Sequence, residues 1–442
     1  MYAWVVATVA ATAGLLFGFD IAVIKGAIVF LRQQWGLSEW QTEVAASALL
    51  FGCVAGAAAG GALSDRFGRR RVLMLCALLF GVSALGAALP RDLAEFVAAR
   101  FLGGVAIGVA SLLAPLYIAE VAPAHRRGRL VSLNQMAIVT GILLAYFINW
   151  TLSFGGANSW RWMFAAAAVP SAAFFAALLF VPESPRWLVA RGRAAEALAV
   201  LRRTLGAAPA AETLTRIEEA IREESGTLAE LIRPGFRRAL GIALFLAVMQ
   251  QWTGVNTVLF YGALILKDQV GGQSDSSAIG ASVLIGVVNF AATIAAIALI
   301  DRWGRKALLI ASALGMAVCL AGLAFAFRQQ PPSAALVITC MLGCVASFGA
   351  GLGPGVWVVL SEIFPNRIRG RAMGLATMAL WCACVVLTMT YLSLSSALGP
   401  AGAFTLYAGM CLATAAFVWR LTPETKGRTL EDIESLFQEK HP

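Results

Sequence analysis

Charged side chains are scarce in this sequence. Only 13% of its 442 residues are Asp, Glu, Lys or Arg, whereas 60% are hydrophobic. A water-soluble chain of this length needs far more polar side chains to cover its surface. Histidine is scarcer still: His125 falls in a predicted loop and His441 in the tail. We find no metal-ligand cluster, nucleophile motif or phosphate-binding loop in the sequence, so we expect no enzyme activity, no metal and no cofactor.

The scarce charges leave long apolar runs uninterrupted. Each run has about 20 residues or more, the length of an α-helix that spans a bilayer core. The first run begins almost at Met1 without a basic segment or cleavage site, so we expect a retained helix and no signal peptide. The twelve runs are 4–30, 41–63, 72–89, 93–121, 131–152, 161–181, 239–266, 277–300, 307–327, 334–361, 372–398 and 402–420. They predict an all-α membrane protein with twelve transmembrane helices.

Basic residues are unevenly distributed among the connections. Of the 34 Lys and Arg residues, 27 end or follow the even-numbered runs. This asymmetry is typical of the positive-inside rule, under which basic residues remain in the cytoplasm. Both termini are therefore predicted to be cytoplasmic, and the net charge of +10 is interpreted as a determinant of orientation, with no nucleic acid as partner. The eight cysteines lie inside apolar runs and are expected to be buried structural thiols.

Three motifs occur twice in the same order. They are S-D-R-F-G-R-R and I-D-R-W-G-R-K, then E-x-x-P-x-x-x-R-G-R in both copies, then P-E-S-P-R-W-L and P-E-T-K-G-R-T-L. The pairs begin at Ser64 and Ile300, at Glu120 and Glu362, and at Pro182 and Pro423. Their offsets of 236, 242 and 241 residues are nearly constant, which indicates a duplicated half.

The duplication predicts the domain organisation. Two six-helix halves that enclose a site near the bilayer midplane are a transporter architecture. We predict an N-terminal bundle at 1–181, a cytoplasmic linker at 182–238, a C-terminal bundle at 239–420 and a cytoplasmic tail at 421–442. The Ala, Leu, Arg and Glu pattern of the linker predicts short surface helices.

These motifs, together with Q-Q-W-T-G-V-N at 250–256, resemble the sugar porter branch of the major facilitator superfamily. The resemblance covers nearly the whole chain and is greatest to bacterial proton-coupled symporters of the xylose and glucose type. It implies import of a monosaccharide (a hexose, a pentose or a related polyol) together with protons by alternating access. The short loops and the absence of extensions favour a bacterial inner membrane, and we expect a monomer. The motifs are specific for the family and do not identify the sugar.

Three carboxamides lie within seven residues of one apolar run, at Gln250, Gln251 and Asn256. An unsatisfied amide in hydrocarbon is costly, so these groups must contact protein, water or ligand. An amide both donates and accepts hydrogen bonds, as a sugar hydroxyl does. They are therefore candidate sugar-binding groups, with interhelical hydrogen bonding as the structural alternative. Gly254 is expected to weaken the helix between them.

The resemblance extends this candidate site. The sugar-contacting positions of the family fall here on Gln250, Gln251, Asn256, Tyr261, Asn289 and Trp357, followed by Phe260 and Trp381. The chain departs from its relatives at Ile142, Leu380 and Cys384, where polar side chains are expected. Either the substrate has fewer hydroxyl groups to satisfy, or it binds differently.

Asp20 lies inside the first apolar run, where acids are rare and usually functional. At 1.5 Å per helical residue, Asp20 and Arg100 fall at similar depth in the outer half of the membrane, so we predict that they pair. The resemblance implies that this pair couples proton and sugar movement; a static buried ion pair is the alternative. Lys25 replaces a small residue of the relatives and is expected to snorkel to the outer interface or to compete for Asp20.

The charges of the repeated loops have two interpretations. The arginines anchor the loops in the cytoplasm. The resemblance further implies a gating network whose ion pairs hold the halves together and separate when the inside opens. Its predicted members are Asp65, Arg66, Arg69, Glu120, Arg127, Asp301, Arg302, Arg305, Glu362 and Arg369.

Three other functions remain open at this point. Asp20 argues against a passive sugar facilitator of the same fold. A sugar sensor of this family would carry a longer cytoplasmic tail, and Q-Q-W-T-G-V-N argues against a drug exporter. The expected partners are a small sugar, a proton and the lipid bilayer.

Overall fold

The structure is a computed structural model that describes residues 2–123, 127–223, 234–265, 275–329, 331–364 and 366–426. Five side chains of predicted site residues lie outside the description: Arg127, Phe260, Tyr261, Asp301 and Arg369. His125 and His441 lie outside it as well. Within the described ranges every element is a helix, as the apolar runs predict.

The helices before residue 224 are α1 (Tyr2–Trp35), α2 (Glu39–Phe67), α3 (Arg69–Ala88), α4 (Leu93–Val121), α5 (Arg127–Leu152), the 3-10 helix η2 (Ser153–Gly155), α6 (Ser159–Ala165), α7 (Ala168–Leu178), α8 (Pro185–Ala190), α9 (Ala194–Leu205) and α10 (Ala207–Glu223). Those after residue 233 are α11 (Pro234–Trp252), α12 (Val255–Ile265), α13 (Asp275–Trp303), α14 (Arg305–Ala326), α15 (Ala334–Ala350), α16 (Leu352–Glu362) and α17 (Asn366–Leu421).

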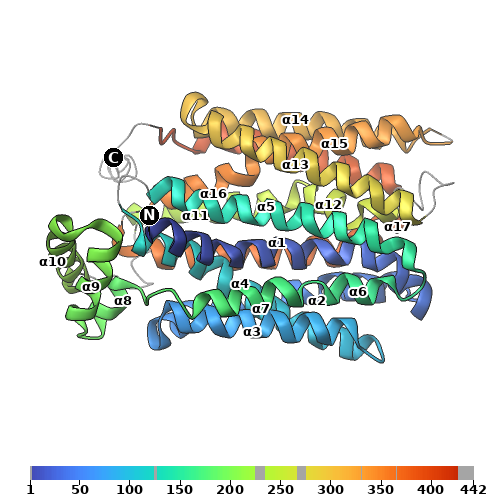
Figure 1. Cartoon of the computed structure of the whole chain (residues 1–442). Coiled ribbons are helices and arrows are strands. Elements are labelled where there is room, and N and C mark those ends of the chain that lie inside the picture. Colours follow the sequence, from blue (N-terminus) through green and yellow to red (C-terminus); the bar gives the residue numbers. More distant parts are fainter. Residues whose placement is uncertain are drawn as a thin grey trace. The chain divides into compact units, whose positions relative to one another are not determined.

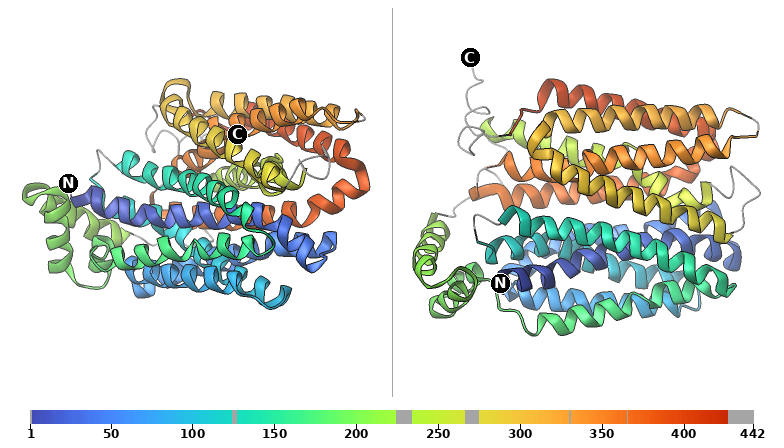
Figure 2. Two further views of the ribbon diagram at one scale, coloured as in Figure 1. Left: turned by 45° about the vertical axis from the view of Figure 1, so that its right-hand side comes forward. Right: turned by 45° about the horizontal axis from the view of Figure 1, so that its top comes forward.

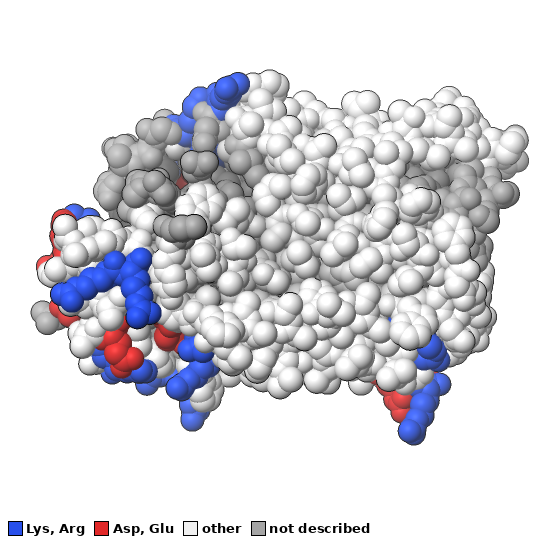
Figure 3. Space-filling model, in the orientation of Figure 1, with Lys and Arg blue, Asp and Glu red and all other residues white. Residues whose placement is uncertain are grey.

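Eleven helical segments of the described chain are long and apolar enough to cross a membrane. The last, Gly370–Leu421, has 52 residues and contains Gly399, whose φ of 71° interrupts the helix. Since about 20 helical residues span a bilayer core, this segment is long enough to cross twice. On the face shown in Figure 3, the described flanks of the long helices carry few charges, which gather mostly over α8–α10 and near helix ends. The chain is a multi-pass membrane protein.

Internal contacts divide the chain into two compact units. Unit 1 comprises Met1–Ile21, Phe51–Ile142 and Phe164–Gly226, and unit 2 comprises Ala22–Leu50, Leu143–Met163 and Thr227–Pro442. The division passes through α1, α2 and α5 and differs from the repeat-based halves. The reason is local: Tyr146 Oη donates to the Leu259 carbonyl, and Glu43 accepts from Ser393. These bonds join early segments to residues after 250 within unit 2.

Glycines bring helices of unit 1 close together. Gly52 of α2 packs against the Phe101 carbonyl of α4, and Gly108 of α4 packs against the Cys53 carbonyl of α2. A β-carbon at either glycine would collide with backbone atoms. Small residues at helix interfaces permit this approach in membranes. Helix α3 lies beside α4 and α7 (Figure 1), so α4, which carries Arg100, packs against both α2 and α3.

The described part of the linker forms short helices, as predicted. Ser184 caps α8 by accepting a hydrogen bond from the Trp187 N–H at 3.3 Å, and Pro185 occupies the first helical turn. Trp187 and Leu188 of α8 form a small apolar core with Ala197 of α9. Figures 1 and 2 show α8–α10 gathered into one group at the ends of the unit 1 helices.

Unit 2 contains the predicted helix break. α11 ends at Trp252 and α12 begins at Val255, and Gly254 between them has a φ of 81°. Only glycine adopts this conformation readily, and the side chain of Tyr407 occupies the space where a β-carbon would lie. A second break at Gly351 separates α15 from α16. The break at Gly254 confirms the prediction and turns the backbone between the predicted amides.

One prediction about the cysteines is wrong. Seven of them are buried or partly buried free thiols, but Cys382 of α17 is exposed. Residues two positions apart on a helix lie about 200° apart, so Cys382 faces outward because Cys384 faces inward.

Candidate functional site

Asp20 and Arg100 form an ion pair inside unit 1. Arg100 Nη1 lies 3.2 Å from Asp20 Oδ1, and Arg100 Nη2 donates to the Asp20 carbonyl at 2.7 Å. The side chains are only 3% and 1% exposed. The structure therefore brings together the two residues that helix geometry paired, one from α1 and one from α4.

The pair is held by a single carboxylate contact. The Arg100 guanidinium also lies over the Phe164 ring at 5.2 Å from its centroid, which stabilises the cation. Among the described residues, Arg100 Nε has no hydrogen-bond partner. A buried arginine that binds a carboxylate with both nitrogens of its fork is the stronger arrangement. One contact leaves this pair weaker, and therefore easier to separate.

Lys25 does not reach the surface, so the expectation that it snorkels is wrong. Its side chain is buried, and Nζ donates to Tyr146 Oη at 3.0 Å. The ammonium group also lies 5.1 Å from the centroid of the Tyr146 ring. The physical reason is packing: Asn149 Nδ2 donates to the Val23 carbonyl at 2.9 Å and holds this part of α1 against α5.

The predicted amides form a chain of hydrogen bonds in unit 2. Gln250 Nε2 donates to the carbonyls of Leu352 and Gly353, both at 2.9 Å. Gln251 Nε2 donates to Gln250 Oε1 at 3.3 Å, and Asn256 Nδ2 donates to Gln251 Oε1. The chain begins at the α15–α16 break and crosses the α11–α12 break, so both broken helices meet at these amides.

The remaining predicted sugar contacts are less closely connected. Asn256 Nδ2 lies 3.6 Å from Cys384 Sγ, which joins the amide chain to α17. Trp381 of the same helix is buried, and Trp357 of α16 is partly buried. Asn289 is buried on α13, where its side-chain oxygen faces Gly349 of α15. The amides and Cys384 are thus brought together, whereas Asn289 lies against a different helix.

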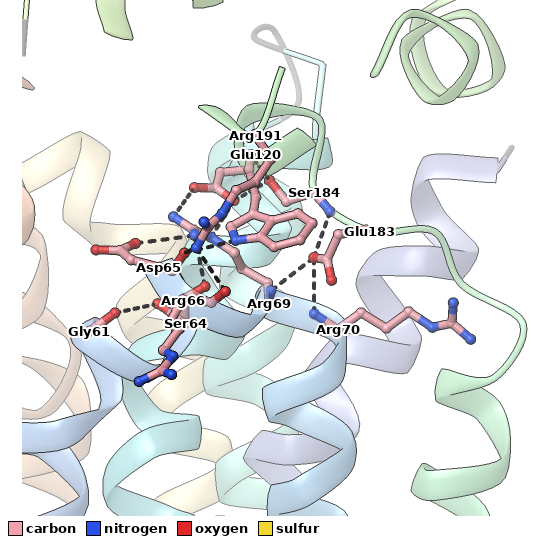
Figure 4. Close-up of polar contacts among 11 residues, drawn as sticks. Gly61, Ser64, Asp65, Arg66, Arg69, Arg70, Glu120, Glu183, Ser184 and Arg191 are labelled. Atoms are coloured by element: carbon pink, nitrogen blue, oxygen red, sulfur yellow. Dashed lines mark hydrogen bonds and ion pairs between the residues drawn. The ribbon is translucent and has the colours of Figure 1, made fainter. Parts of the chain in front are cut away.

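The first loop motif forms a network in unit 1 (Figure 4). Arg69 binds Glu120 through Nε at 3.1 Å and Nη2 at 3.2 Å, and its Nη1 lies 3.2 Å from Asp65. Glu183 accepts from the backbone N–H groups of Arg69 and Arg70 at 2.8 and 3.1 Å. This carboxylate therefore caps the N-terminus of α3, where anions are stabilised.

The second loop motif repeats the network in unit 2. Arg305 binds Glu362 through Nε at 3.2 Å and Nη2 at 2.9 Å. Glu424 accepts from the N–H groups of Arg305 and Lys306, both at 3.0 Å, and so caps α14. Burial opposes the charge on Glu424, but hydrogen bonds from backbone N–H groups outweigh it and lower the pKa of this carboxyl.

The sequence matches the family described as Sugar (and other) transporter over residues 6–437. The chain belongs to this family. The arabinose-proton symporter of Bacillus subtilis (strain 168) is 40% identical over 431 residues, covering 96% of this chain and 92% of that protein. The D-xylose-proton symporter of Escherichia coli (strain K12) is 37% identical, covering 99% and 96%.

Solved structures place this sugar transporter family member in the major facilitator superfamily. A structure of the proton:xylose symporter of that superfamily has a TM-score of 0.85 and 37% identity, covering 99% of each chain. A partially occluded inward-open structure of the E. coli xylose transporter has a TM-score of 0.86 and 36% identity, covering 97% and 99%. The predicted fold class and family are confirmed.

Among the described residues, two predicted members of the gating network lie outside the ion pairs of the loop motifs. Arg66 is exposed, with its guanidinium over the Phe67 ring at 5.2 Å. Arg302 is exposed, and its carbonyl accepts from Lys426 Nζ at 2.7 Å. The side chains of Arg127, Asp301 and Arg369 lie outside those that the structure describes.

Several polar residues at these sites were not identified from the sequence. The hydroxyl groups of Ser184 and Thr425 donate to Glu120 and Glu362, respectively. The repeat could have revealed them, because each follows the Pro-Glu of the third motif. Glu43 is buried in α2, and the Ser393 N–H and hydroxyl donate to it at 3.0 and 2.9 Å. Its position in the sequence carries no such pattern.

Proposed function

We propose that this protein is a proton-coupled symporter that imports a monosaccharide by alternating access. The observation that carries the proposal is the buried Asp20–Arg100 pair in a chain of the sugar transporter family. A passive facilitator needs no ionisable acid inside the membrane, where a charge is costly. Relatives named as arabinose-proton and D-xylose-proton symporters support the same mechanism.

Asp20 is the proposed proton carrier. A proton from outside binds the Asp20 carboxylate and removes the charge that attracts Arg100. The 3.2 Å contact with the carboxylate is then lost and only the 2.7 Å bond to the Asp20 backbone carbonyl remains, so Arg100 is held less firmly and α4 can move relative to α1. Release of the proton inside restores the pair. The two states of the pair thus bias the two conformations that alternating access requires.

The amides are the proposed sugar-binding groups, together with Tyr261, Asn289, Trp357 and Trp381. Gln251 and Asn256 hydrogen-bond to each other, and a sugar hydroxyl can replace either partner because it both donates and accepts. Such an exchange conserves the number of hydrogen bonds, so binding is reversible. The tryptophans offer flat apolar faces to the C–H side of a sugar ring.

The placement in the membrane completes the proposal. The protein is a monomer of twelve spans in the cell inner membrane, with both termini in the cytoplasm and no enzymatic activity. Its halves are residues 1–181 and 239–420, joined by the linker 182–238 and followed by the tail 421–442. The two loop networks act at the cytoplasmic side as a gate, each anchored within its own unit by the Arg69–Glu120 or Arg305–Glu362 pair.

The test is uphill accumulation of sugar in proteoliposomes driven only by a proton gradient. The wild-type protein concentrates a radiolabelled monosaccharide such as D-xylose or L-arabinose. Asp20→Asn mimics the protonated acid permanently, so it abolishes accumulation while sugar binding persists. Arg100→Ala also uncouples, because nothing then senses the charge on Asp20. Downhill exchange, measured in parallel, reports whether each variant is folded and competent. Accumulation by Asp20→Asn at the wild-type level would show that the pair is structural.

A further inference from the structure

Glu43 is a buried acid that the coupling mechanism does not use. It lies in unit 2, and both of its carboxylate oxygens accept hydrogen bonds from Ser393 of α17. Oε1 accepts from the backbone N–H at 3.0 Å, and Oε2 accepts from the hydroxyl at 2.9 Å. One turn further along α2, Ser47 donates to Met389 Sδ, which lies one turn before Ser393. The two helices therefore run antiparallel here and are in contact over two consecutive turns.

A second contact of the same kind involves α5. Tyr146 Oη donates to the Leu259 carbonyl of α12 at 3.4 Å. Gly286 of α13 packs so closely against Tyr146 that a β-carbon would lie 2.8 Å from its ring. At Gly280, a β-carbon would lie 2.9 Å from the indole nitrogen of Trp150. These contacts also belong to unit 2, and they hold this part of α5 against α12 and α13.

The contact between Glu43 and Ser393 lies near the outer ends of its helices. With the N-terminus in the cytoplasm, as proposed above, α2 begins at the outer side, and Glu43 is its fifth residue. Ser393 is six residues before Gly399, which interrupts α17. At 1.5 Å per residue, the two positions are about 6 and 9 Å from these outer ends. The contact joins the repeat-based halves 1–181 and 239–420, so it must break whenever the outer side opens.

We propose that Glu43 is a gating residue, which closes the outer side by binding Ser393 and releases it each time sugar enters from outside. This rests on the proposed function, a transporter that works by alternating access. A carboxylate accepts both bonds at once, whereas an amide has only one acceptor oxygen. Bonds to a charged acceptor are stronger than neutral ones, so the closed contact is held firmly. On opening, water supplies the same two donors, and the contact can therefore form again.

The test measures how often the outer side opens. Ser47→Cys places a thiol in the contact between α2 and α17, where the side chain is completely buried. The full-length protein in right-side-out vesicles is treated with a membrane-impermeant maleimide, and the protein without this cysteine gives the background of the native thiols. Glu43→Ala removes both bonds and should accelerate labelling about tenfold. Ser393→Ala keeps the N–H bond and should accelerate it about threefold.

Matched variants separate gating from a general loosening of the fold. Ser393→Thr keeps the hydroxyl, and Glu39→Gln changes an exposed acid one turn before Glu43, so both should label at the wild-type rate. A shift toward the outward-open state lowers the half-saturating concentration of external sugar and raises that of internal sugar, whereas loosening moves both in the same direction.

The inference is overturned if Glu43→Ala and Ser393→Ala label at the wild-type rate, or if the two half-saturating concentrations move together. If Glu43→Ala does not reach the membrane, Ser393→Ala decides the question, because it removes only a hydroxyl group. Labelling needs no sugar, so it tests the gate separately from the proposed function. Failure of the wild-type protein to take up any sugar would refute that function instead.

Discussion

The two loop motifs share the same hydrogen-bond geometry but differ in how much of the ion pair is exposed to solvent. In both, an arginine binds a glutamate through Nε and Nη2, and its Nη1 donates to a backbone carbonyl at 3.2 Å. In the first motif the arginine and glutamate side chains are 9% and 6% exposed, and in the second they are 14% and 25% exposed. The geometry repeats because the motif spacing repeats, whereas the burial does not.

The neighbouring residues explain the difference. In the first motif, Trp187 Nε1 donates to the Asp65 carbonyl at 3.0 Å, and Arg191 donates to the carbonyls of Asp65 and Arg66 at 2.8 Å. Two side chains therefore supply hydrogen bonds to the backbone carbonyls in the last turn of α2. In the described part of the second motif, which ends at residue 426, Lys426 Nζ donates to the Arg302 carbonyl at the end of α13 at 2.7 Å. Arginine offers several donors in a rigid fork, but lysine acts as one point charge.

The difference in burial between the two ion pairs indicates that the two motifs have different roles. A buried pair loses most when one partner is removed, because the other charge remains in low dielectric. A partly exposed pair is screened by water and separates at little cost. Within the proposed gate, the first motif is therefore suited to hold α2, α3, α4 and α8 together as the fixed part, and the second is suited to be the part that opens and closes.

The largest expected difference lies between Glu120→Gln and Glu362→Gln. Glu120→Gln removes the buried anion of Arg69 and leaves only the exposed Asp65 carboxylate beside it, so it should cost about 3 kcal/mol of stability. Glu362→Gln should cost about 1 kcal/mol, because solvent screens the remaining arginine. The measurement is the free energy or midpoint of unfolding of both purified variants in one detergent. Equal losses would remove the distinction between a holding motif and an opening one.

A smaller effect is expected at Glu424, and it depends on pH. The folded-state pKa of this carboxyl lies below its ordinary value of 4.5, so its charge stabilises the fold above pH 4.5. That stabilisation is lost as the pH falls through the lowered pKa. Glu424→Gln should therefore lower the free energy of unfolding at pH 7 by less than about 1 kcal/mol, because the cap is partly exposed, and lower the thermal midpoint slightly.

The same Glu424 variant provides its own control. At a pH below the folded-state pKa the wild-type carboxyl is neutral, so variant and wild type should unfold at the same temperature. A difference that stays constant from pH 7 down to the lowest pH at which the wild-type protein remains folded would mean that the contact depends on shape and hydrogen bonding, and not on charge.

The smallest effect is expected for Asp65→Asn. Asp65 pairs with Arg69 at 3.2 Å, but its side chain is 75% exposed. Exposed pairs contribute about 0–1 kcal/mol, so the unfolding midpoint should hardly change. A loss comparable to that of Glu120→Gln would show that Asp65 contributes to the network through more than this ion pair. Arg66, whose guanidinium lies over Phe67, provides a matched exposed position for comparison as Arg66→Gln.

Much of the candidate site was predictable because its residues recur at fixed spacings along the sequence. The repeated motifs placed Arg69 beside Glu120 and Arg305 beside Glu362, since ion pairs at helix ends follow from where the helices end. Depth along a helix follows from residue number, so Asp20 and Arg100 could be paired. The break at Gly254 followed from residue type alone.

Residue spacing does not predict which face of each helix points inward or which helices lie beside it. The sequence alone determined a membrane protein of the sugar transporter family, its duplicated motifs and its intramembrane acid, because composition and spacing need no knowledge of packing. Only the tertiary structure decided that Lys25 is buried against Tyr146, that Gln250 binds the backbone of α16, and that Cys382 faces outward. Each depends on which helix lies alongside, and in a membrane every apolar face is equally suited to lipid or to another helix.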